Sequence, residues 1–404
     1  MMNRYLLTLG ITTLIALTGF AALNTVVDPF GLWELRRSEG INHYKPAFTR
    51  GMQPVKPHVV KRRQPQVLIL GSSRVGEGLS CAMLAAPSCY NGAFPGGSLY
   101  EASRLIGQTS GRTHSIYLGL DFEAAIKPDV RAPGFSERRF SRDPQQQPNP
   151  VYPWQLVVDY YSLSLTADTS LGSLRTLWRQ AAERNPVFSR SLDPDGSWDL
   201  RTVAASETVA AAQQARVFRL IRRYSDNILS AQSKAGEDVL AARMDAWFTL
   251  LQGIIESSRN RGTELQLFIN PSHALYHDAL HQSGTTPLFM DWLRRLQSLE
   301  QAYAGFLPPV WNFADYDRYS SSELPGRKLN LWFNDPVHYS RRLGELLLRQ
   351  MRGECGDSGP GRCLRNQDLV QFSSRFLAAG SSYSEQLQAS GFLTKAKPGA
   401  GAGA

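Results

Sequence analysis

Five short apolar runs constrain the fold of this chain more than any other feature. They span Gln66 to Leu70, Ser88 to Asn91, Ser115 to Leu120, Glu264 to Ile269 and Val310 to Phe313. Short apolar runs bounded by turn residues are typical of buried strands. Because helical patterns alternate with them, they predict an α/β fold with a parallel sheet flanked by helices on both faces.

The remaining segments divide the chain by composition. Helices are predicted from Ser98 to Gln108, Gly236 to Ser258, Pro287 to Ala304 and Ser340 to Met351. Residues 28–64 form a lead-in segment, and residues 65–354 form the α/β domain with a mostly helical insertion at about 128–235. Residues 355–404 are predicted to be a C-terminal tail that is partly disordered, because it ends in a Gly-Ala run.

The N-terminus, residues 1–27, predicts a membrane anchor or a signal. No charged side chain lies between Tyr5 and Val27, a stretch long enough to cross a bilayer as a helix. The tripeptide Gly19-Phe20-Ala21 is a weak cleavage site, which favours an uncleaved anchor over a signal peptide. The flanking Arg residues, Arg4 before the stretch and Arg36-Arg37 after it, do not decide the orientation.

Four cysteines occur as two close pairs, and their spacing bears on the compartment. Cys81 and Cys89 bracket one short loop, and Cys355 and Cys363 bracket another. Neither pair has the Cys-x-x-Cys spacing of a zinc site, so no metal is expected. Local pairing favours two disulfides in an oxidising compartment, with four free thiols as the alternative.

The charge of the chain bears on its partners. The net charge is +9 and the isoelectric point is about 9.4, which favours an anionic partner such as an acidic glycan or a membrane surface. The basic residues are scattered and no nucleic-acid-binding motif is present, so nucleic acid is not expected as a partner. A basic surface without a specific partner is the alternative.

Two motifs carry the candidate chemistry. Gly71-Ser72-Ser73-Arg74 follows the first apolar run, and Asp335-Pro336-Val337-His338 precedes a helical pattern. Each motif alone is a common turn. Together they supply a nucleophile, Ser73, a general base, His338, and a carboxylate, Asp335, that would orient the imidazole. The ends of parallel strands meet at one edge of a sheet, where such a site would form.

Other residues at the predicted strand ends are candidates for binding. The backbone N–H groups of Ser73 and Gly96 are candidates for an oxyanion hole, although Gly96 could simply serve a turn with positive φ. Arg74, Asp121 and His273 are possible substrate-binding residues. The alternatives are a structural salt bridge for Arg74, a helix cap or a loop contact for Asp121, and a surface position for His273.

These motifs resemble the blocks of the SGNH hydrolase superfamily. Leu70-Gly71-Ser72-Ser73 is similar to the first block, with Ser in place of the usual Asp before the nucleophile. Asn91 to Gly97 resembles the second block and places Gly96 at its oxyanion Gly, while Asp335 and His338 match the last block. The third block departs from the pattern, because Asp121 stands where the family carries an Asn that helps to hold the oxyanion.

The resemblance extends to the periplasmic, membrane-anchored branch that includes alginate-type O-acetyltransferases and the D-alanyl transfer proteins of Gram-positive bacteria. It implies an SGNH-like, flavodoxin-like fold and O-acyl transfer, most simply acetyl transfer, to an exported or cell-surface polysaccharide through an acyl-serine. It also implies an integral membrane acyltransferase as acyl donor, and no cofactor is expected. The N-terminal anchor and the predicted disulfides together predict a single-pass protein of the bacterial inner membrane with its catalytic domain in the periplasm. The alternatives are a periplasmic carbohydrate esterase or deacetylase, and a catalytically silent scaffold of a polysaccharide export complex.

Overall fold

The computed structural model describes residues 2–390 apart from 85, 110, 129–130, 133, 182–188, 202–205, 230–233, 323–329 and 357. The Gly-Ala run therefore lies outside the described residues. The chain forms two compact units. Unit 1 comprises Met1–Pro65, Arg104–Arg112 and Pro133–Ala204, and unit 2 comprises Gln66–Ser103, Thr113–Ala132 and Ala205–Ala404.

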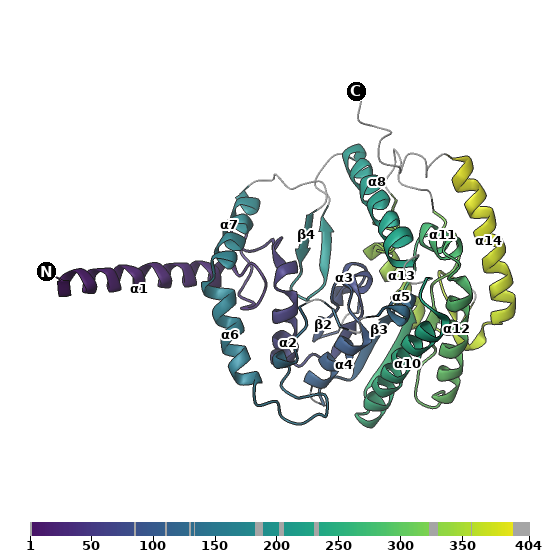
Figure 1. Cartoon of the computed structure of the whole chain (residues 1–404), viewed down its shortest axis with the longest axis horizontal. Helices are drawn as coiled ribbons and strands as arrows, with labels where there is room; N and C mark the ends of the chain where they lie inside the picture. The colour runs from purple at the N-terminus through teal and green to yellow at the C-terminus, as the bar shows by residue number, and fades with distance from the viewer. Residues whose placement is uncertain are drawn as a thin grey trace. The chain divides into compact units, whose positions relative to one another are not determined.

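Unit 2 is built on a mixed, mostly parallel sheet of six strands, and its helices are labelled in Figure 1. The strands are β1 (Val67–Leu70), β2 (Cys89–Asn91), β3 (Ser115–Leu120), β6 (Glu264–Ile269), β7 (Trp311–Asn312) and β8 (Arg362–Cys363). Their order is β2-β1-β3-β6-β7-β8, and only β7 and β8 pair antiparallel. Without β8, this is the 2-1-3-4-5 order of flavodoxin-like sheets, which confirms the α/β class.

The five predicted strands are all present, and one strand of this sheet was missed. Strand β8 adds an antiparallel edge, so the expectation of a purely parallel sheet is corrected. Two residues are too short a run to give a periodic signal, and pairing with β7 decides this strand. The expected tail also contains helix α14 (Leu369–Ala389), in which Phe372 and Phe376 are buried.

Helices pack on both faces of the sheet, as the apolar strands require. Ile69 and Phe268 belong to a core cluster with Leu343 and Leu347 of α13. On the other face, α10 lies against β6. The helices of unit 2 are α3 (Ser73–Gly78), α5 (Phe122–Ile126), α8 (Ser206–Arg222), α10 (Glu237–Asn260), α11 (Ala274–Gln282), α12 (Thr286–Ala302), α13 (Arg341–Met351) and α14. Helix α4 (Leu99–Gln108) begins in unit 2, and its residues from Arg104 onward belong to unit 1. Unit 2 also has short 3-10 turns at Cys81–Met83 and Leu364–Asn366 and a π-helix at Arg223–Leu229.

Both expected disulfides are present. Cys81 bonds to Cys89 and so ties the turn after α3 to β2, while Cys355 bonds to Cys363 and ties the loop after α13 to β8. All four cysteines of the chain are thereby oxidised. Covalent closure of two short loops is typical of proteins from oxidising compartments.

Unit 1 contains the apolar N-terminal helix α1 (Met2–Val27), which is long and apolar enough to cross a membrane. In Figure 1 this helix projects from the rest of the unit. The unit also holds α2 (Met52–Arg63), α6 (Tyr152–Leu165), α7 (Ala167–Ala181), the antiparallel pair β4 (Ser189–Leu192) and β5 (Trp198–Arg201), and 3-10 turns at Phe48–Arg50 and Glu137–Arg139. The segment at about 128–235 is thus not only helical, and its last part, α8, belongs to unit 2.

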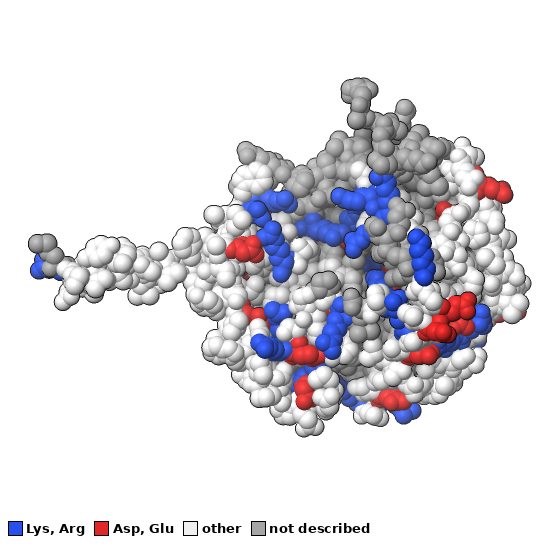
Figure 2. All heavy atoms as spheres, viewed as in Figure 1, with Lys and Arg blue, Asp and Glu red and all other residues white. Residues whose placement is uncertain are grey.

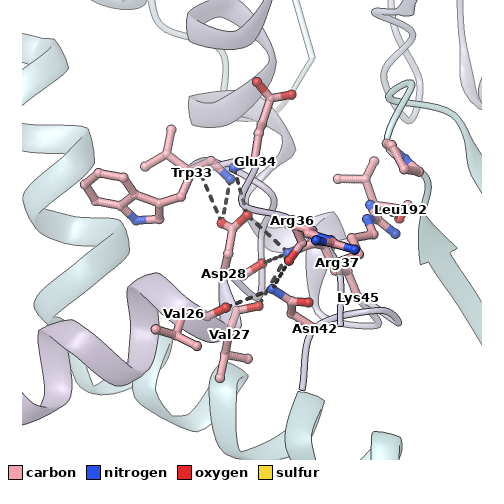
Figure 3. Close-up of polar contacts among 12 residues, drawn as sticks. Val26, Val27, Asp28, Trp33, Glu34, Arg36, Arg37, Asn42, Lys45 and Leu192 are labelled. Atoms are coloured by element: carbon pink, nitrogen blue, oxygen red, sulfur yellow. Dashed lines mark hydrogen bonds and ion pairs between the residues drawn. The ribbon is translucent and has the colours of Figure 1, made fainter. Parts of the chain in front are cut away.

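The C-terminal end of α1 is held by a buried ion pair, drawn in Figure 3. Lys45 Nζ lies 3.1 Å from Asp28 Oδ2, and both side chains are almost fully buried. The Asp28 carboxylate also accepts hydrogen bonds from the backbone N–H groups of Leu32 and Trp33. Asn42 Nδ2 donates to the carbonyl of Val26 at 2.9 Å, so carbonyl groups at the helix end are satisfied by the body of the unit.

Candidate active site

Ser73 is the first residue of α3 and follows β1 across a sharp turn. Gly71 has a φ of +144°, and a Cβ there would lie 2.6 Å from Val75 Cγ2 and 3.0 Å from the Gly119 carbonyl oxygen. Only glycine fits this turn, which ends the strand and starts the helix within two residues. Ser72 caps the helix by accepting a hydrogen bond from the backbone N–H of Arg74. Ser73 therefore lies just past the carboxyl end of β1, which pairs in parallel with β2 and β3, and α/β sheets place their sites at such strand ends.

Ser73, His338 and Asp335 form a continuous hydrogen-bonded chain in unit 2. His338 Nε2 lies 2.8 Å from Ser73 Oγ, and His338 Nδ1 lies 2.7 Å from Asp335 Oδ2. Since a carboxylate only accepts, Nδ1 donates to Asp335 and Nε2 accepts from the Ser73 hydroxyl. This is the arrangement in which a serine hydroxyl can lose its proton to an imidazole.

Hydrogen bonds within the Asp-x-x-His segment fix the conformation of its turn. Asp335 Oδ1 accepts hydrogen bonds from the backbone N–H groups of Val337 at 3.0 Å and His338 at 2.9 Å. The N–H of His273 donates to the carbonyl of Pro336, which fixes the middle of the turn. The three-residue spacing thus lets one carboxylate order the turn and orient the imidazole at the same time.

Two charged residues that the sequence analysis missed complete this cluster. Glu77 lies one helical turn after Ser73 on α3, and its Oε1 is 4.0 Å from His338 Nε2. Arg216 of α8 lies between the two carboxylates, 2.6 Å from Asp335 Oδ2 and 3.1 Å from Glu77 Oε2. The i, i+4 spacing of Ser73 and Glu77 was readable from the sequence. Arg216 lies in the segment interpreted as an insertion and carries no motif.

The charges of this cluster follow from its contacts. Burial acts to raise the pKa of the Asp335 carboxyl, but the nearby His338 and Arg216 outweigh burial and lower this pKa well below its usual range. Burial opposes the charge of Arg216, yet Glu77 and Asp335 raise the pKa of its guanidinium. With both carboxylates ionised and Arg216 positive, the three groups carry one net negative charge beside His338. An imidazolium formed at His338 would lie beside this negative charge.

Glu77, Asp335 and His338 also satisfy the simplest geometric test for a metal site, since their ligand atoms lie within 4.8 Å of one another. Arg216 donates to both carboxylates from inside this group. A cation at the same place would face the guanidinium charge at close range. We therefore assign the cluster to ion pairing and give no step to a metal.

Arg74 and Asp121 bind each other and not an open pocket. The Arg74 side chain is buried, with Nη2 2.6 Å from Glu123 Oε1 and Nη1 3.2 Å from Asp121 Oδ1. Asp121 also accepts from Asn270 Nδ2 at 2.9 Å. Burial raises the pKa of Asp121, although Arg74 opposes this. Arg74 thus forms the structural salt bridge that was its alternative, within a buried network that includes Asp121, and substrate binding by either residue stays a prediction.

His273 is also buried, so its expected surface position is wrong, while its contact with substrate stays a prediction. Its Nδ1 accepts from the N–H of Leu275 and so caps α11, and its Nε2 lies 3.0 Å from the Ser322 carbonyl oxygen. Burial lowers the pKa of His273 to about 4, so the ring is neutral at pH 7. Its position at a strand end was predicted, but its helix-capping role needed the tertiary structure.

The expected oxyanion donors are open to bonding. Gly96 is exposed with a φ of +66°, and a Cβ there would meet nothing within 4 Å. Among the described residues, the N–H groups of Ser73 and Gly96 have no hydrogen-bond partner, whereas those of Gly92, Ala93, Phe94 and Gly97 in the same loop are used. These two N–H groups thus remain candidates for holding a developing negative charge.

The fold and site together define an α/β protein with a Ser-His-Asp arrangement at the carboxyl edge of a mostly parallel sheet. No protein-family model matches the chain, and no curated protein and no solved structure matches it. The functional argument therefore depends on the geometry of this site and on the motifs in the sequence.

Proposed function

We propose that this chain is a membrane-anchored serine O-acyltransferase with an SGNH-like fold, acting on an exported or cell-surface polysaccharide. The observation that carries the proposal is the hydrogen-bonded chain from Ser73 through His338 to Asp335, with distances of 2.8 and 2.7 Å. A scaffold without catalysis has no need for a buried carboxylate that orients an imidazole toward a serine hydroxyl. This geometry favours the enzyme over the scaffold.

The first half-reaction would load the acyl group onto Ser73. His338 Nε2 takes the hydroxyl proton while Ser73 Oγ bonds to the carbonyl carbon of an acyl donor. The carbonyl oxygen becomes an oxyanion, and the N–H groups of Ser73 and Gly96 would hold it. The bond to the leaving group then breaks, and His338 returns its proton to that group. Asp335 and the negative charge beside it stabilise the imidazolium between these steps.

The second half-reaction would release the acyl group to an acceptor. A sugar hydroxyl gives its proton to His338 and attacks the acyl carbon, and the proton returns to Ser73 as the new ester leaves. Water in place of the sugar would give hydrolysis. Transfer and hydrolysis therefore share every residue, and the esterase or deacetylase remains the second candidate until acceptors are compared.

The setting of the site supports an exported acceptor. The two disulfides are typical of an oxidising compartment such as the bacterial periplasm. Helix α1 would tether the protein to the inner membrane, where an integral membrane acyltransferase could supply the acyl group. The net charge of +9 suits an anionic glycan. No cofactor is needed for either half-reaction.

The test is turnover of a chromogenic acetyl ester by the full chain in detergent, with and without oligosaccharides of uronic acid or of neutral glucose. Ser73→Ala and His338→Ala should abolish turnover. Ser72→Ala is the matched control, because it removes a helix cap and a hydrogen bond to Asp121 but no group that would react, and it should cost about 1–2 kcal/mol of stability while turnover persists. Acetylated oligosaccharide as product would support transfer, and free acetate alone would support the esterase. Equal turnover in all four proteins would contradict the enzyme.

A further inference from the structure

Two helices of unit 1 present apolar faces to the outside. The exposed side chains are Trp154, Val157 and Tyr161 on α6 and Leu171, Leu174 and Trp178 on α7. Their exposed fractions run from 44% at Leu171 to 68% at Trp154. Within each helix the three residues stand at positions i, i+3 and i+7, so they share one face.

The buried faces of the same helices are polar or small. The buried residues of α6 are Asp159 and Ser164, and Asp159 is paired with His58 and Arg139. Helix α7 buries Thr169, Ser173 and Thr176. A surface helix in water shows the opposite pattern, with its apolar side inward. The outer faces of α6 and α7 are therefore suited to an apolar environment.

The two helices adjoin the base of α1. Both contact α1, and Figure 1 shows them running across its inner end. Asn24 of α1 donates to the Ser164 carbonyl of α6 at 2.8 Å, and Ser173 of α7 donates to Asn24 Oδ1 at 2.7 Å. In Figure 2 the margin of unit 1 next to α1 is mostly white, so few charged side chains show there.

The length of α1 places these helices close to lipid. The exposed, uncharged part of α1 covers residues 5–20 and spans about 24 Å at 1.5 Å per residue. The hydrocarbon core of a bilayer is about 30 Å thick. The exposed part is therefore too short to cross it alone. The last turns of α1, which pack against α6 and α7, must lie at membrane depth as well.

The connection between α1 and the body of unit 1 is stiff. The Asp28–Lys45 pair and the Asn42 contact to Val26 fix the helix end directly to the unit, with no free linker between them. The body therefore cannot swing away from the membrane that α1 enters.

We propose that α6 and α7 lie in the membrane interface as a two-helix platform around α1, with their outward faces in contact with lipid. Three of the six side chains are Trp or Tyr, the residues that favour the boundary between headgroups and acyl chains. A groove lined by Ala21, Thr25, Trp33, Val157 and Tyr161 makes this surface continuous with α1. The inference rests on α1 entering a bilayer and is independent of the chemistry at Ser73.

Depth-dependent fluorescence quenching tests the platform. Because all four native cysteines are in disulfides, an engineered cysteine is the reactive thiol of the full chain. Val157→Cys and Leu174→Cys would each carry a bimane label in nanodiscs of phosphatidylcholine and phosphatidylglycerol. Ile15→Cys on α1 is the membrane-inserted control, and Gln145→Cys, exposed on the loop before α6, is the aqueous control.

Lipids brominated along their acyl chains should quench the labels at Val157 and Leu174 several-fold more than the label at Gln145. Quenching at Ile15 with none at Val157 and Leu174 would overturn the platform and leave those faces to a partner protein. No quenching at Ile15 would show that α1 does not enter the bilayer, and the inference would fall with it. Acetyl-ester turnover, measured on the same samples, reports separately on the proposed function.

Discussion

Arg216 separates two buried carboxylates, and its removal is the most informative perturbation of the site. The side chains of Glu77 and Asp335 have no solvent exposure, and Arg216 bonds to both. The Arg216→Met variant would keep the length of the side chain and lose its charge. Two buried negative charges would then face each other without a partner. Removing one member of a buried ion pair costs about 3–5 kcal/mol, which is the loss of unfolding free energy that we expect.

A charge-balanced double variant controls for this loss. The three groups carry a net charge of −1 in the native chain, −2 in Arg216→Met, and −1 again in Glu77→Gln/Arg216→Met. The double variant should therefore recover most of the lost stability. Acetyl-ester turnover should fall about ten- to hundredfold in the single variant, equivalent to about 1.4–2.7 kcal/mol, because Asp335 loses the donor that positions it.

Urea unfolding of the full chain in detergent, followed by fluorescence, measures the stability change, and pH gives a second check. The lowered pKa of Asp335 stabilises the fold above the ordinary value near 3.9 and ceases to do so as pH falls through the lower folded value. The cost of Arg216→Met should therefore shrink below about pH 4. Native stability in Arg216→Met at pH 7, or a double variant no more stable than the single, would refute the charge argument.

Three further predictions concern other parts of unit 2. Burial lowers the pKa of His277 from 6.5 to about 3, so the unfolded chain takes up a proton at a higher pH than the folded chain does. The stability of the fold should therefore decrease as pH drops from 6.5 toward 3, and His277→Phe should reduce this decrease in thermal melts. Replacing Cys81 and Cys89 by Ser opens a loop with a sequence separation of 8 and should cost about 2.5 kcal/mol in urea unfolding. Gly97→Ala would place a Cβ 2.7 Å from the Gly71 carbonyl oxygen, so acetyl-ester turnover should fall as the loop shifts. A pH profile unchanged by His277→Phe would contradict the first prediction. A loss of less than about 0.5 kcal/mol on removal of the Cys81–Cys89 bond would contradict the second, and normal turnover in Gly97→Ala would contradict the third.

The strands were predictable because a strand buried on both faces of a sheet is a short, continuous run of apolar residues, and such a run is easy to recognise in the sequence. β3 and β6 have the bounds that the sequence indicates, Ser115–Leu120 and Glu264–Ile269. The meeting of Ser73 with Asp335 and His338 was predictable for a related reason, since parallel strand ends converge on one edge. Strand β8 was not, because its two residues gain their structure only from pairing with β7.

The partners of charged residues could not be predicted. Arg74 stands next to Ser73 in the sequence, yet its guanidinium turns inward to Glu123, from a different segment. Arg216 carries no motif, and only the fold brings it to Asp335. Periodicity likewise shows that α6 and α7 have one apolar face but not that this face points outward, because that depends on what surrounds the helix.

The most direct test of the central claim is the intact mass of the full chain after brief exposure to a chromogenic acetyl ester, followed by peptide mapping. The account predicts one added acetyl group, located on Ser73, present in Ser72→Ala and absent in Ser73→Ala. An acetyl group on another residue, or no adduct and no turnover in the native chain, would contradict a nucleophilic Ser73 and favour a scaffold without catalysis.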